Sequence, residues 1–142
     1  MTAGAPSGPT ARQLFDELMS AYLDAGDHAR GWAALVDRTS SLLDELGTMP
    51  QAVEGTVERL RSQWAAGTPD AAELLRGKVD LWHFLSDKQG TTLTIADAED
   101  RSVRAALTLA EPDCPPEAVS DSAAWVADML SADPWPSATS MF

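Results

Sequence analysis

The chain has 142 residues, of which 10 are Lys or Arg and 22 are Asp or Glu, so its formal net charge at pH 7 is −12. Its hydrophobic content of 44% is enough for one domain with its own core and excludes a wholly disordered chain. The acidic excess disfavours nucleic acids and anionic membranes as ligands, because it repels both, and favours a basic protein as partner.

The first predicted helix begins after Thr10, which can form a capping box with Gln13, and ends at Gly26. Asp27 can cap a second helix that ends at Gly47. Apolar residues recur at spacings of three and four in both segments, which is typical of amphipathic helices. In the first segment they are Leu14, Phe15, Leu18, Met19, Tyr22 and Leu23.

The third predicted helix begins with a second capping box, Thr48 with Gln51, and ends at Gly67. Its apolar stripe is narrower and consists of Val53, Val57, Leu60 and Trp64. Thr68 followed by a proline predicts the start of a fourth helix, which ends at Gly90.

Residues 91–95 are mostly β-branched, but we predict an ordered loop there because no partner strand occurs elsewhere. Asp97 can cap a short fifth helix that extends to about Ala110. A proline-rich connector follows, and a final helix is predicted to start near Ser120 or Asp121.

These elements predict an all-α, single-domain helical bundle of about five to six helices. Because the first four helices are joined by very short linkers, we expect them to be antiparallel neighbours in an up-and-down arrangement. The predicted organisation is a flexible leader over residues 1–9, the bundle over 10–131, and a Pro-rich tail, flexible or docked, over 132–142.

The leader has no basic end and no apolar run, and no uncharged apolar stretch approaches the about 20 residues that cross a bilayer. Cys114 is the single cysteine, so no intramolecular disulfide can form, and its acidic surroundings predict an inert thiol. We therefore predict a cytoplasmic protein without membrane association.

The sequence contains no metal-ligand pattern and no phosphate-binding loop, so neither a metal nor a cofactor is predicted. Acidic pairs at helical spacing could bind Mg²⁺, but solvated helix faces are the simpler interpretation of Asp16 and Glu17, Asp44 and Glu45, and Glu54 and Glu58. Asp80 and His83 are three residues apart and could form a general base in a small helical enzyme; the simpler interpretation is a surface ion pair.

Tryptophan is frequent for a chain of this size. Four of the five, Trp32, Trp64, Trp82 and Trp125, fall on apolar stripes and are expected to anchor the core. The fifth, Trp135, lies between two prolines in the tail, where it either docks on the bundle or contributes to a contact surface.

From residue 91 onward, nine acidic residues face only two basic ones, Arg101 and Arg104, so the C-terminal third is the negative pole of the chain. This surface could be merely solubilising, or it could bind a basic partner. The two arginines could also pair internally with Glu99 or Asp100. The residues expected to contact a partner are Asp97, Glu99, Asp100, Glu111, Asp113 and Trp135.

Two segments, Asp80-Leu-Trp-His-Phe-Leu-Ser-Asp87 and Thr94-Ile-Ala-Asp through Ala-Glu-Pro112, resemble a pattern in small acidic actinobacterial proteins. These are immunity-type proteins of polymorphic toxin systems. The resemblance covers about a quarter of the chain, residues 80–112, and includes no catalytic motif. It implies a cytoplasmic protein that neutralises a basic toxin domain by surface complementarity.

Two alternatives remain beside this protein-binding interpretation. One is the small helical enzyme, acting on a natural product or a nucleotide through Asp80, His83 or a carboxylate cluster in the bundle. The other is a homodimeric adaptor, in which the narrow stripe of the third helix pairs with its own copy about a two-fold axis.

Overall fold

The computed structural model describes residues 8–89 and 98–131, and within these ranges it contains α-helices and short 3₁₀ helices but no strand. In chain order the elements are α1 (Ala11–Asp24), α2 (His28–Leu46), α3 (Gln51–Ala65), α4 (Ala71–Gln89), α5 (Ala98–Ala106), η1 (Leu107–Ala110), η2 (Pro116–Ala118) and α6 (Val119–Leu130). The all-α class and the number of helices are confirmed.

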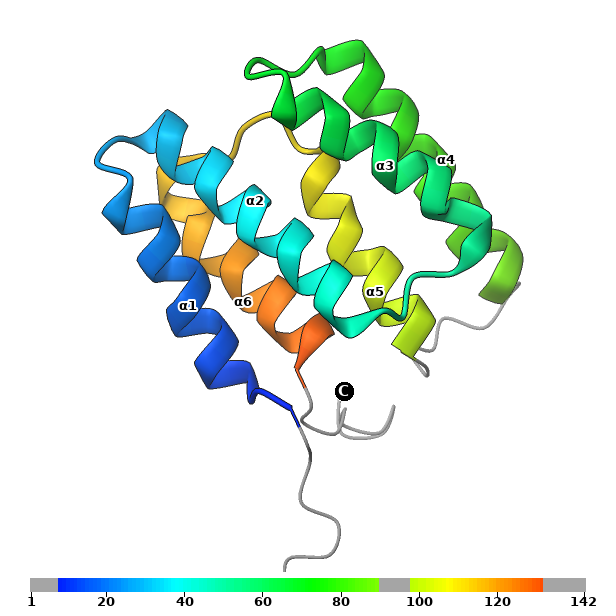
Figure 1. The fold of residues 1–142 in the computed structure, drawn as a ribbon, viewed down its shortest axis with the longest axis horizontal. Helices are drawn as coiled ribbons and strands as arrows, with labels where there is room; N and C mark the ends of the chain where they lie inside the picture. Colours follow the sequence, from blue (N-terminus) through cyan, green and yellow to red (C-terminus); the bar gives the residue numbers. More distant parts are fainter. Residues whose placement is uncertain (1–7, 90–97, 132–142) are drawn as a thin grey trace, which may run out of the picture.

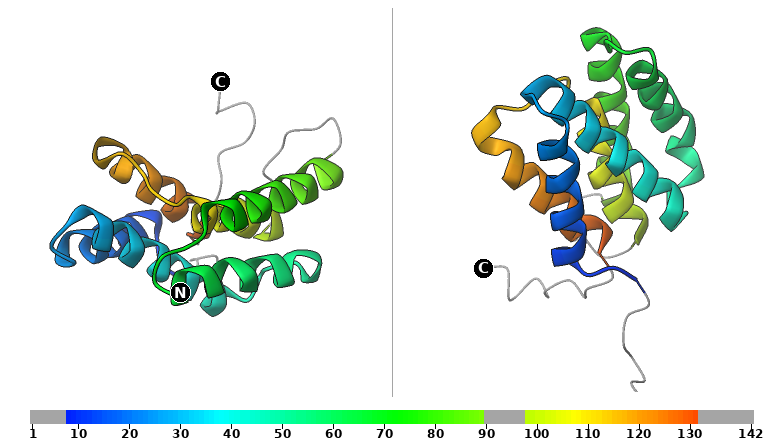
Figure 2. Two further views of the ribbon diagram at one scale, coloured as in Figure 1. Left: turned by 90° about the horizontal axis from the view of Figure 1, so that it is seen from above. Right: turned by 60° about the vertical axis from the view of Figure 1, so that its left-hand side comes forward.

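The helices lie in two layers, with α1, α2 and α3 packed on α6, α5 and α4 (Figures 1 and 2). The antiparallel pairs α1/α2 and α3/α4 are as predicted. In contrast, α2 and α3 contact each other little, and the α3/α4 pair joins the rest of the molecule largely through η1. The segment formed by α5 and η1 is therefore the central element of the fold, and all four residues of η1 are buried.

Local sequence signals fix the ends of α1 and α2. Thr10 Oγ1 accepts a hydrogen bond from the backbone N–H of Gln13, whose side chain accepts from the N–H of Thr10, as the capping box predicts. Asp27 caps α2 by accepting from the N–H of Arg30. Gly47 ends α2 in the left-handed conformation, at φ 63°.

The predicted caps of the next two helices are wrong. Pro50 occupies the N-cap of α3 and offers no side-chain hydrogen bond, while the hydroxyl of Thr48 instead bonds that of Ser102 on α5. Asp70 replaces Thr68 as the cap of α4, because its Oδ1 accepts from the N–H of Ala72 at 2.8 Å. In the case of Thr48, a tertiary contact with α5 takes the hydroxyl that local capping would have used.

Several sequence predictions fall outside the described residues. They concern most of the leader, the loop at 91–95, the cap at Asp97, and the tail from residue 132 with Trp135. Among the helices that the structure describes, none is long and apolar enough to span a membrane.

Candidate functional site

Of the two acidic residues of α5, Glu99 and Asp100, only Glu99 lies on the surface. Asp100 is only 3% exposed, because α5 occupies the centre of the fold, so its carboxylate is not presented to a partner. Glu99 is exposed on the first turn of α5. The guanidinium of Arg101 donates to the carbonyls of Asp128 and Ser131 at the end of α6.

Glu111 and Asp113, in the connector after η1, are both engaged inside the molecule. Lys78 Nζ donates to Glu111 Oε1 at 2.7 Å, which ties α4 to the connector. His28 Nε2 lies 2.9 Å from Asp113 Oδ1, although 72% of the Asp113 side chain is exposed. Asp113 therefore holds the connector to α2 through His28 and still presents its carboxylate to solvent.

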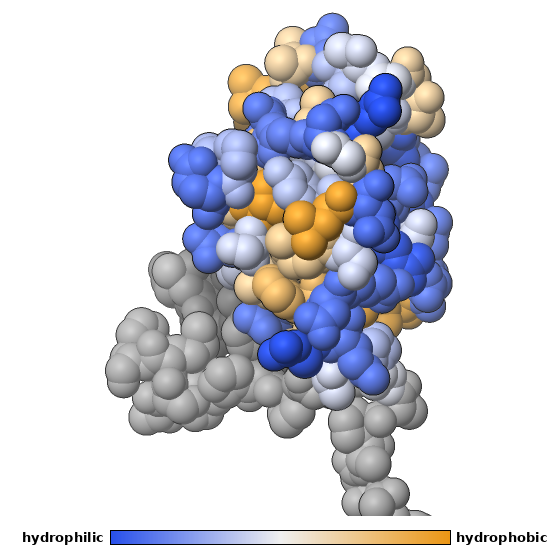
Figure 3. Space-filling model, turned by 90° about the vertical axis from the view of Figure 1, so that its left-hand side faces the viewer, coloured by the Kyte–Doolittle hydropathy of each residue, from blue (hydrophilic) through white to orange (hydrophobic). Residues whose placement is uncertain are grey.

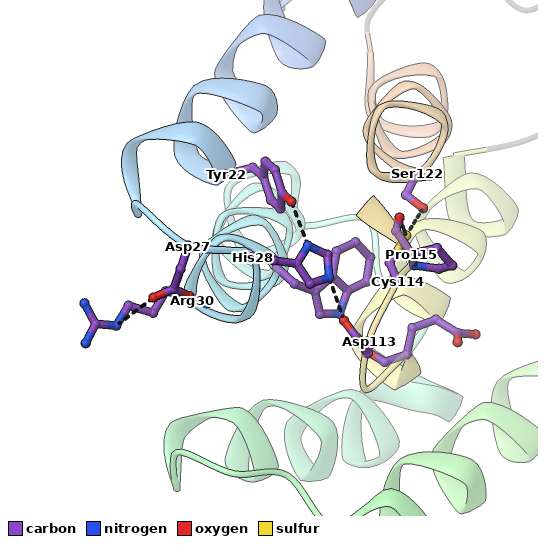
Figure 4. A network of polar contacts seen from close by, with 10 residues as sticks. Tyr22, Asp27, His28, Arg30, Asp113, Cys114, Pro115 and Ser122 are labelled. Atoms are coloured by element: carbon purple, nitrogen blue, oxygen red, sulfur yellow. Dashed lines mark hydrogen bonds and ion pairs between the residues drawn. The ribbon is translucent and has the colours of Figure 1, made fainter. Parts of the chain in front are cut away.

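His28 links α1 to the connector through a chain of hydrogen bonds. Its Nδ1 lies 2.7 Å from Tyr22 Oη, and its Nε2 lies 2.9 Å from Asp113 Oδ1 (Figure 4). The carboxylate can only accept, so Nε2 carries a hydrogen, and in the neutral ring Nδ1 then accepts from the Tyr22 hydroxyl.

The pKa of the Asp113 carboxyl is lowered from its ordinary value. The larger cause is a hydrogen bond from the backbone N–H of Cys114, and the hydrogen bond from His28 adds to it. The carboxylate is thus held ionised, and it lines a groove between the connector and α6.

This groove has a volume of about 400 Å³. Trp32 and Leu107 line it together with Trp125, whose side chain belongs to α6. Cys114 also borders the groove, but its thiol is buried and lies 3.5 Å from Ser122 Oγ (Figure 4).

The outward side of η2 and α6 carries a stripe of Glu117, Asp121, Trp125 and Asp128, which we call the α6 face. The four residues are exposed and recur at spacings of four, four and three. Residues 112–131 contain no Lys or Arg. In the described part of the chain, none of the three carboxylates makes an ion pair.

Elsewhere in the described chain many acidic residues do have a basic partner, because most of the basic side chains there form ion pairs. These are Arg12, Arg30, Arg38, Arg59, Arg61, Arg76 and Lys78. Carboxylates without an ion pair also occur elsewhere in the described chain, as at Asp24, Glu54 and Asp87, but those three lie on three different helices. On the α6 face three such carboxylates share one side of the molecule.

Glu117, Asp121 and Asp128 belong to the negative C-terminal third but were not among the predicted contact residues. The helical spacing of residues 117, 121, 125 and 128 was the signal that could have identified them. The contact between His28 and Asp113 had no comparable signal, because 85 residues separate the two.

Only two of the four tryptophans expected in the core lie against it. Trp32 is 2% exposed and Trp64 packs on the core, whereas Trp82 and Trp125 are 43% and 38% exposed. For Trp82 and Trp125 the prediction is wrong.

The pair proposed for an enzyme is not assembled as expected. Asp80 Oδ2 accepts from Arg59 of α3 at 3.1 Å, and no hydrogen bond joins it to His83 within the described residues. His83 is exposed. Within the same residues there is also no group of three or more His, Cys, Asp or Glu side chains that could hold a metal ion.

A second exposed surface lies on α4, where Leu75, Val79 and Trp82 share one face; we call it the α4 stripe. Their exposed fractions are 60%, 45% and 43%. The corresponding stripe of α3, proposed for dimerisation, faces inward, since Val53, Val57 and Leu60 are buried. The side of α1 seen in Figure 3 is mostly hydrophilic, with a small central group of hydrophobic side chains.

Comparison with known protein families, with curated proteins and with solved structures finds no match. The resemblance over residues 80–112 therefore remains a prediction.

Proposed function

We propose that this chain is an acidic protein-binding module that recognises a basic partner through the α6 face. The observation that carries the proposal is the set of three exposed carboxylates, none of them in an ion pair within the described residues, around the exposed ring of Trp125. Unpaired surface carboxylates attract a basic partner and raise its association rate. Tryptophan is enriched among the residues that dominate binding energy.

The specific form of this proposal is an immunity function, in which the chain neutralises a basic toxin domain by covering its surface. The support for this form is the resemblance over residues 80–112, together with the charge of the chain. The contact residues proposed from the structure are those of the α6 face, joined by Asp113 and Glu99, which are also exposed.

The test is capture of partners on the immobilised chain at low and high salt. A triple variant, E117Q/D121N/D128N, removes the charge of the α6 face. The matched control, D24N/E54Q/D87N, removes three exposed carboxylates that make no ion pair within the described residues, so both variants have the same net charge.

We expect one stoichiometric basic partner, held by the wild type and the control, lost by the α6 variant and weakened by salt. Equal capture by both variants would show that the α6 face has no special role and would contradict the proposal.

A second candidate function is a homodimeric adaptor, which we propose pairs through the α4 stripe. Three large apolar side chains exposed along one helix are the observation that favours it. Residues 71–89 carry three acidic and three basic side chains, so a second copy meets less repulsion here than elsewhere on a chain of charge −12. A two-fold axis near Val79 sets Leu75 of one copy against Trp82 of the other.

A further inference from the structure

We infer that the groove between the connector and α6 is a binding site for an organic cation, namely the guanidinium or ammonium group of a basic side chain on the partner. This inference rests on the proposed function and names the chemical group that the module would recognise. The volume of the groove, about 400 Å³, falls within the range of small-ligand sites, about 300–1,000 Å³.

The walls of the groove are suited to the aliphatic part of a Lys or Arg side chain. Leu107, Pro115 and Ala118 supply apolar surface, and the exposed ring of Trp125 supplies aromatic surface. Long basic side chains bury their methylene groups against such surfaces while the charged end stays near water. A cation beside an indole ring gains further stabilisation from the π system.

The charges around the groove favour a cation. Asp113, Asp121 and Glu111 all line it. Two of these acids already have partners, since Lys78 pairs with Glu111 and His28 bonds Asp113. Asp121 makes no hydrogen bond or ion pair in the described residues, so its carboxylate is available to a ligand.

Trp125 is held in place before any ligand binds. Its Nε1 donates to the backbone carbonyl of Arg104 at 3.3 Å, which fixes the indole against α5. Because the ring is already fixed, little conformational entropy of the Trp125 side chain is lost when a ligand binds beside it. The groove therefore combines a positioned ring with an available negative charge.

The test uses N-acetyl-arginine amide as the probe and N-acetyl-citrulline amide as its uncharged isostere. The readout is the Trp125 indole N–H resonance in ¹⁵N–¹H NMR spectra, assigned with Trp125→Phe. We expect a saturable shift of this resonance with the arginine probe, none with the citrulline probe, and a loss of affinity of about two- to fivefold in Asp121→Asn. The control Asp24→Asn should bind as the wild type does.

Equal shifts with both probes, or an undiminished affinity in Asp121→Asn, would overturn the inference. These outcomes are separate from failure of the proposed function. If the arginine probe does not bind but the α6 variant still loses a basic partner, the groove site is wrong and the protein-binding function stands.

Discussion

The indole of Trp64 donates a hydrogen bond to the backbone carbonyl of Leu109 at 2.7 Å, and this bond ties α3 to the central segment. The same relationship recurs from two other helices. Trp32 of α2 donates to the carbonyl of Glu111 at 2.9 Å, and Trp125 of α6 donates to that of Arg104. Three helices thus use a tryptophan to satisfy carbonyl groups where the α-helical hydrogen bonding of α5 gives way to η1 and the connector.

We predict that Trp64→Phe lowers the free energy of unfolding by about 1–3 kcal/mol, because it keeps a ring but leaves the buried Leu109 carbonyl without this donor. Urea denaturation measures the change. Trp82→Phe is the control, since that indole is exposed and makes no hydrogen bond within the described residues; its effect should stay within about 0.5 kcal/mol. Similar losses in both variants would contradict the assigned role.

A second prediction concerns the close approach of α1 and α2 at Gly31. A Cβ added there would lie 2.7 Å from the backbone oxygen of Tyr22, which cannot move without displacing α1. We expect Gly31→Ala to destabilise the fold by about 1–3 kcal/mol, measured by thermal or urea unfolding. The displacement should also break the contact between Tyr22 and His28.

Gly55→Ala is the matched control for this change, because a Cβ at this position in α3 meets no atom within 4 Å. It should stabilise the chain by about 0.5–1 kcal/mol, as Gly→Ala does inside an open helix. If Gly31→Ala behaved in the same way as Gly55→Ala, the packing of α1 on α2 would not be as described.

The third prediction is a pH dependence that arises from Asp113. Its pKa is lowered in the folded state, so the unfolded chain binds more protons near the ordinary Asp pKa of about 3.9. The stabilisation is therefore present above that pH and is lost as the pH falls through the lowered pKa. Wild type should be more stable than Asp113→Asn at neutral pH, and the two should converge in acid.

Chemical denaturation at a series of pH values from neutral to acid gives this comparison directly. Asp24→Asn is the control and should follow the wild-type curve. A constant difference between wild type and Asp113→Asn across the whole series would mean that the titration of this carboxyl does not contribute.

The fourth prediction tests the α4 stripe. If a second copy covers it, light scattering should show a concentration-dependent dimer, and Val79→Glu should abolish it by placing a charge at the centre of the contact. Leu23→Glu, at an apolar residue of α1 that is 66% exposed, should dimerise as the wild type does. A wild type that stays monomeric at every concentration would contradict this candidate.

Local signals predicted most of the fold. The caps at Thr10 and Asp27 and the left-handed Gly47 are properties of a few neighbouring residues, so they could be read before any tertiary contact was known. Thr48 shows the limit of this approach, because its hydroxyl forms a contact with Ser102, 54 residues away.

The site was harder to predict because charge counts do not report burial. Asp100 and Asp121 contribute equally to the acidic excess, but the first lies in the central helix and the second on an outer one. Only the order of packing, with α5 between α4 and α6, separates them. The same holds for the tryptophans, since Trp32 is buried and Trp125 is exposed although both fall on apolar stripes of the sequence.

The central claim is that the partner covers the α6 face, and carboxyl footprinting tests it most directly. Free chain and partner-bound chain are treated with a carbodiimide and glycine amide, and the modified acids are identified by mass spectrometry. We predict that Glu117, Asp121 and Asp128 are modified in the free chain and protected in the complex. Asp24, Glu54 and Asp87 should be modified equally in both, and protection of these three with continued modification of the α6 face would contradict the account.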